Sequence, residues 1–141
     1  MINKFNYYLE KGHVKRKTSD PVESKSLLDK ATSRINYFKK ITEEDASIVL
    51  ENAYEGIRES AQSLMSLKGY KPYSHEATIS FIKEFYKEFT EEDINNFDRF
   101  RQLRSDSVYR AVHISKEEAE LCLGFARGFV NKVKNIHAKQ S

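Results

Sequence analysis

Residues 42–69, TEEDASIVLENAYEGIRESAQSLMSLKG, decide the fold of this chain. Apolar side chains recur every three or four residues along the stretch, at Ala46, Val49, Ala53, Ile57, Leu64 and Leu67. This period is typical of a helix that buries one side. Thr42 is followed by carboxylates, which suit the positive end of a helix dipole, and Gly69 is a natural helix terminator. The stretch therefore predicts one long helix from Thr42 to Gly69.

Four further helices are predicted around this one. Asp20 and Pro21 mark a helix start, and a helix from about 21 to 40 follows. The segment GYKPYSHEA is a turn, after which Ser74 starts a shorter helix. Thr90 caps the next helix, and the Ser115 capping box opens the last one. No strand is expected. Short connections favour antiparallel neighbours, so the predicted fold is all-α, an up-and-down bundle of four to five antiparallel helices.

Composition limits the class of protein. The chain has 141 residues, 39% hydrophobic and 32% charged, which predicts a single globular domain over 1–141 with a partly helical N-terminal arm at 1–19. No apolar run is long enough to span a bilayer, and no signal peptide is recognisable, so we expect a cytoplasmic protein without membrane contact. The single cysteine, Cys122, excludes an internal disulfide, and no motif for a metal or a nucleotide cofactor occurs. We expect neither metal nor cofactor.

Residues 101–114, RQLRSDSVYRAVHI, place Arg101 and Arg104 on an apolar stripe. The other positions within roughly 60° of this line are Ile94, Phe97, Phe100, Val108, Ala111 and Val112. Arginine keeps its charge, so each guanidinium needs a carboxylate, a phosphate or a second subunit. Two interpretations stay open. Pairing with Glu55, Glu59 or Asp98 would fix helix register, whereas two arginines on one helix face also suit a phosphate clamp.

The residues that follow Arg104 raise a question of geometry. Ser105, Asp106 and Ser107 are weak helix formers, so the helix can break there. In an unbroken helix, Arg104 and Tyr109 lie about 140° apart around the axis and face different directions. His113 lies just before the next helix, and His75 is expected to be exposed in a first turn.

Two other features concern exposed surfaces. The basic run from His13 to Lys17 is expected to be a solvated linker. In the last helix, Gly124 and Gly128 lie on nearly one line opposite the apolar stripe. If they allow a close approach by another backbone, a second copy of the chain is the natural partner.

The chain resembles the HEPN domains (higher eukaryote and prokaryote nucleotide-binding). The resemblance runs from ENAYEGIRESAQSLMSLKGYKPYSHEATISFI to RQLRSDSVYRAVHISKEEAELCLGFARGFVNKVKNI. It implies a small helical bundle, often a dimer, of a kind frequently encoded beside a nucleotidyltransferase in toxin–antitoxin pairs. Catalytic members are metal-independent ribonucleases whose motif has an arginine, a polar residue and, with four to six residues between, a histidine.

Carried onto this sequence, the motif arginine is Arg104 and the polar residue is Ser105. With four residues between, the position is Tyr109 rather than histidine, and His113 follows after eight. The resemblance thus implies a degenerate motif, in which Arg104, with Arg101 and Tyr109, binds a nucleotide or RNA phosphate. We expect a homodimer and a toxin–antitoxin component with a nucleotidyltransferase partner. The alternatives are an endoribonuclease that uses Arg104 with Ser105, Tyr109 or His113, and a non-catalytic protein-interaction module.

Overall fold

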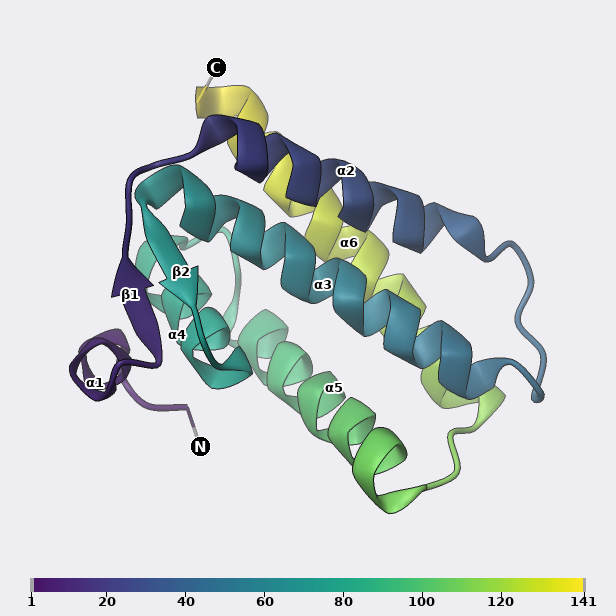
Figure 1. Ribbon diagram of the computed structural model, residues 1–141. Coiled ribbons are helices and arrows are strands. Elements are labelled where there is room, and N and C mark those ends of the chain that lie inside the picture. Colours follow the sequence, from purple (N-terminus) through teal and green to yellow (C-terminus); the bar gives the residue numbers. More distant parts are fainter. Residues whose placement is uncertain (1, 141) are drawn as a thin grey trace.

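Helix α3, Ala46–Lys68, lies at the centre of the fold in the computed structural model, which describes residues 2–140 (Figure 1). Helices α2 and α6 pack along α3, and α4 and α5 contact its remaining side. The other described elements are α1 (Phe5–Lys11), β1 (Val14–Arg16), α2 (Pro21–Tyr37), β2 (Tyr70–Pro72), α4 (His75–Phe85), α5 (Glu91–Arg110) and α6 (Lys116–Gln140). Met1 and Ser141, the ends of the predicted domain, lie outside the described residues.

The predicted all-α class is confirmed, but the described residues form six helices rather than four to five. The helix outside the predicted bundle is α1, which lies in the arm expected to be partly helical and whose seven residues are too few to show a helical period in the sequence. None of the helices within residues 2–140 combines the length and the apolar character needed to cross a membrane.

Hydrogen bonds of capping residues fix several helix starts. At α5, Thr90 and Asp93 each accept the other's backbone N–H, at 3.1 and 3.0 Å. The start of α3 differs from the prediction, because Thr42 and Asp45 make the same reciprocal pair and close a separate turn before Ala46. Helix α2 ends at Tyr37, a few residues before the predicted end near 40.

The predicted apolar face of α3 is buried. Its members Ala46, Val49, Ala53, Ile57 and Leu64 all belong to the core, and Leu67 packs partly buried against it. At Gly56 the packing against α2 is close, since a Cβ there would lie 3.1 Å from Ile35 Cγ2. Glycine therefore lets these two helices approach each other along their length.

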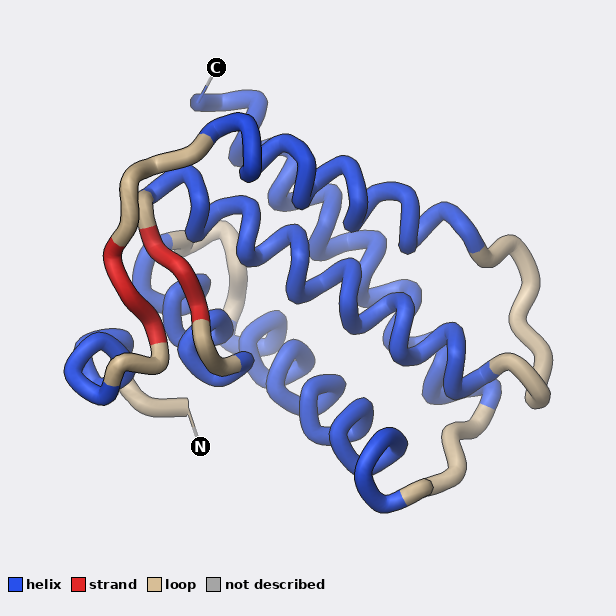
Figure 2. The backbone as a smooth tube through the Cα atoms, in the orientation of Figure 1, coloured by secondary structure: helices blue, strands red, loops and turns tan. Residues whose placement is uncertain are grey.

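Two short strands contradict the expectation that the chain has none. Strands β1 and β2 pair antiparallel, with Val14 opposite Pro72 and Arg16 opposite Tyr70 (Figure 2). The basic run that was expected to be a solvated linker therefore pairs as a strand with the segment that was expected to be a turn. Three residues are too few for the alternation by which a strand is recognised, and Lys15, Arg16 and Lys71 are exposed.

The second half of α5 is helical but largely uncovered. The helix continues through Ser105 to Ser107 and reaches Arg110, after which Ala111 adopts a left-handed conformation with φ 53°. Its buried residues end at Phe100, whereas Val108, Ala111 and Val112 are exposed. The apolar stripe is therefore only half covered, because no element of the described chain packs over its C-terminal part.

Candidate functional site

A hollow of about 540 Å³ opens between α2, α3 and α5. Arg34 and Tyr37 of α2 form one side, Asn52 and Glu55 of α3 form the floor, and Arg104 of α5 forms the other side. Tyr37, Phe38 and Ile48 make part of the wall apolar. The hollow thus combines charged groups with an apolar surface, as sites for small organic anions do.

Arg104 is the unusual group in this wall. Its Nε is buried and has no hydrogen-bond partner among the described residues. A guanidinium stays charged and acts only as a donor, and a buried donor without an acceptor costs free energy. An acceptor supplied by a ligand would remove this cost.

Arg101, in contrast, has a partner in its own helix. Its Nε and Nη2 both lie 2.8 Å from Asp98 Oδ1, three residues earlier. Asp98, one of the three carboxylates predicted as partners for Arg101 and Arg104, therefore pairs with Arg101. Glu55 and Glu59 each pair with a different arginine.

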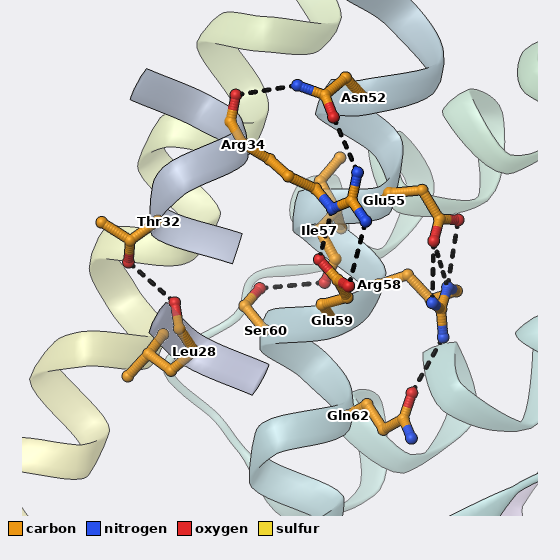
Figure 3. A network of polar contacts seen from close by, with 10 residues as sticks. All are labelled: Leu28, Thr32, Arg34, Asn52, Glu55, Ile57, Arg58, Glu59, Ser60 and Gln62. Carbon is orange, nitrogen blue, oxygen red and sulfur yellow. Dashed lines mark hydrogen bonds and ion pairs between the residues drawn. The ribbon is translucent and has the colours of Figure 1, made fainter. Parts of the chain in front are cut away.

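Glu59 pairs with Arg34 across the α2–α3 contact (Figure 3). Arg34 Nε donates to Glu59 Oε1 at 2.7 Å, and Arg34 Nη1 donates to Asn52 Oδ1 at 2.9 Å. Asn52 Nδ2 in turn donates to the backbone carbonyl of Arg34 at 3.1 Å. Only 4% of Glu59 is exposed. Arg34 is thus held by α3, and its charge is offset within the chain.

Glu55 pairs with Arg58, one turn farther along α3 (Figure 3). Arg58 Nη2 donates to Glu55 Oε2 at 2.8 Å, and Arg58 Nη1 donates to Gln62 Oε1 at 2.9 Å. Burial alone would raise the pKa of Glu55, but the hydrogen bonds and charge of Arg58, with the charge of Arg104, lower it below its ordinary value. Glu55 is therefore a carboxylate, and its hydrogen bonds go to Arg58.

His75 joins this region from the first turn of α4. Its Nδ1 lies 2.7 Å from the hydroxyl of Tyr54, and the two rings stack 5.6 Å apart with only 7° between their planes. His75 is half-buried rather than exposed as predicted. Nothing in the sequence connects these two residues, which lie 21 positions apart.

The tautomer of His75 follows from its partner. Tyr54 is buried, and among the described residues its hydroxyl has no partner other than His75 Nδ1. Burial raises the pKa of Tyr54, so the hydroxyl keeps its proton, and that proton has an acceptor only if Nδ1 carries none. Burial also lowers the pKa of His75, and the positive charges of Arg58, Arg104 and Arg101 lower it further against the opposing effect of Glu55. The imidazole is thus neutral, with its single proton on Nε2.

The remaining predicted site residues lie away from the hollow. Because α5 is unbroken, Tyr109 projects about 140° around the helix from Arg104, and 77% of it is exposed. His113 lies in the exposed connection to α6, and Ser105 is half-buried beside Arg104 in α5. Within one chain, Arg104 is therefore grouped with Glu55, Arg58 and His75 rather than with Tyr109 or His113.

The family model of the HEPN domain matches residues 8–136, nearly the whole chain. A search of curated proteins found no match. The matched residues include all the groups around the hollow described above.

Proposed function

The chain belongs to the HEPN domain family, and on that premise we propose that its Arg104 side binds a phosphate of a nucleotide or of RNA. The observation that carries this proposal is the buried Nε of Arg104, which has no acceptor among the described residues. Phosphate oxygens match a guanidinium in charge and in geometry. Arg101 adds positive charge one turn away, although its own hydrogen bonds go to Asp98.

The apolar wall of the hollow suits the rest of such a ligand. Tyr37 is largely exposed at the end of α2, and Phe38 and Ile48 lie beside it. A base that stacks on an aromatic side chain gains about 1–3 kcal/mol, whatever its identity. A phosphate at Arg104 with a base against Tyr37 would therefore use both kinds of surface.

A homodimer is part of the proposal. Val108, Tyr109 and Val112 expose apolar surface at the end of α5, and Leu121 does so on α6. On α6 a Cβ at Gly124 or Gly128 would meet nothing within 4 Å, so the described chain leaves this line open to a second copy. Tyr109 would then approach a ligand from the partner copy. A toxin–antitoxin role with a nucleotidyltransferase partner is proposed from family membership.

Fluorescence polarisation with a labelled single-stranded RNA at low salt tests the binding. Arg104→Ala removes a charge-assisted contact, so the affinity should fall at least about tenfold. Arg99→Ala is the matched control, because Arg99 lies on the same helix, is exposed, and points about 140° away. Absence of binding at low salt, or an equal loss in both variants, would refute the proposal and favour a protein-interaction module.

A further inference from the structure

A second hollow, of about 300 Å³, adjoins the Arg104 site along α3. Arg58 and Gln62 of α3 line it together with His75 of α4. Glu55 lines the first hollow and Arg58 lines the second, and these two side chains pair directly. The two hollows are therefore neighbours on one face of α3, separated by a single ion pair.

We propose that Arg58 and the Nε2–H of His75 form a second phosphate position in this hollow, so that the ligand is an RNA strand rather than a mononucleotide. The inference rests on the proposed function, because it takes the Arg104 position as the first phosphate site. It adds to the ligand site a second position made of two residues outside the family motif.

Arg58 retains donors for such a phosphate. Its guanidinium has five N–H groups. The N–H on Nε and one N–H on Nη2 donate to Glu55, and one N–H on Nη1 donates to Gln62. Two N–H groups therefore have no acceptor among residues 2–140. The ion pair with Glu55 also fixes the plane of the guanidinium, so little side-chain entropy is lost when an anion binds.

His75 supplies a donor of fixed direction. The hydroxyl of Tyr54 holds Nδ1 and stacking holds the ring, which leaves Nε2–H as the free edge of the imidazole. A neutral imidazole with its proton on Nε2 can donate to a phosphate oxygen but cannot accept a proton there. His75 is thus a binding group in this arrangement and not a general base.

Charge also favours a polyanion. Arg34, Arg58, Arg101 and Arg104 lie near three carboxylates, Glu55, Glu59 and Asp98, so the cluster carries one net positive charge. The two hollows meet at the Glu55–Arg58 pair, so a strand that crosses this pair would enter both hollows.

Polarisation with a labelled single-stranded RNA of about twelve nucleotides, and competition by uridine monophosphate, test the inference. His75→Phe keeps the stack on Tyr54 and removes the donor, so RNA affinity should fall about fivefold while that of the mononucleotide stays unchanged. Because no charge is lost, the salt dependence of RNA binding should also stay unchanged. Arg104→Ala should weaken both ligands and reduce the salt slope by about 0.7.

Three outcomes separate the two proposals. If neither ligand binds the wild-type protein, the proposed function fails, and the inference fails with it. If both bind through Arg104 but His75→Phe leaves RNA affinity intact, only the second position is refuted. Should His75→Phe fail to fold, Arg58→Lys decides, since it keeps the charge but not the forked donors and should weaken RNA binding alone.

Discussion

Replacing Arg34 by methionine should destabilise the protein. Arg34 pairs with Glu59 across the α2–α3 contact. Arg34 Nε lies 2.7 Å from Glu59 Oε1, and Arg34 Nη2 lies 3.4 Å from Glu59 Oε2. Methionine fills a similar volume but donates no hydrogen bond. The variant would therefore leave a carboxylate that is 4% exposed without a counter-ion.

The expected loss follows from this burial. Removing one partner of a buried ion pair costs about 3–5 kcal/mol. The Arg34 side chain is itself 35% exposed, and water that reaches its place can solvate part of Glu59, so we expect the lower end, about 3 kcal/mol. For a domain of this size each kcal/mol shifts Tm by about 2–4 °C, which predicts a decrease of about 6–12 °C.

Urea denaturation followed by circular dichroism measures the loss as a change in midpoint at constant slope. The double variant Arg34→Met with Glu59→Leu is the control, because it removes both charges and should recover most of the stability. RNA affinity should also fall in Arg34→Met, because Glu59 is then an uncompensated negative charge beside the hollow, and it should recover in the double variant, which removes both charges. A single variant within about 0.5 kcal/mol of wild type would refute the reasoning about this pair.

Three further predictions concern other parts of the chain. Gly69→Ala should lower Tm, because φ is +85° and a Cβ would lie 2.5 Å from the Lys17 carbonyl oxygen. Gly124→Ala meets nothing within the described chain and should stabilise the monomer by about 0.5–1 kcal/mol. Equal effects of the two variants on dilute, monomeric protein would contradict this. Burial raises the pKa of the Cys122 thiol to about 12, so it should react with a thiol reagent only after unfolding. Burial lowers the pKa of His137, so the free energy of unfolding should fall as pH drops below about 6.5. His137→Gln removes this titration and should reduce the fall. Denaturation at several pH values measures both effects.

Local signals in the sequence were sufficient for most of the fold. The starts of α4 and α5 follow from Ser74 and Thr90, whose side chains accept backbone N–H groups three residues later. Such bonds depend on neighbours in the chain, so the sequence displays them directly. The strands depend instead on Arg16 meeting Tyr70, 54 residues away, and no local pattern encodes that pairing.

The second half of α5 shows a different limit. Periodicity places Val108 on the same line as Phe97 and Phe100, yet only the phenylalanines are buried, and Val112 lies beyond the end of the helix. A helical period states which residues share a face, but burial also requires a neighbouring element that extends as far. The same limit explains why the partial burial of His75 was not predicted, because it depends on Tyr54 from another helix.

The position of Arg104 in the sequence explains why it alone among the arginines of the site keeps an unpaired Nε. Arg58 and Arg101 each find a carboxylate three residues earlier on their own helix, at Glu55 and Asp98. The residue three positions before Arg104 is Arg101, another cation, and those three and four positions later are Ser107 and Val108. Side chains three or four apart on a helix are the ones that can pair. Helix α5 therefore presents one paired and one unpaired guanidinium one turn apart, and the unpaired charge faces the hollow.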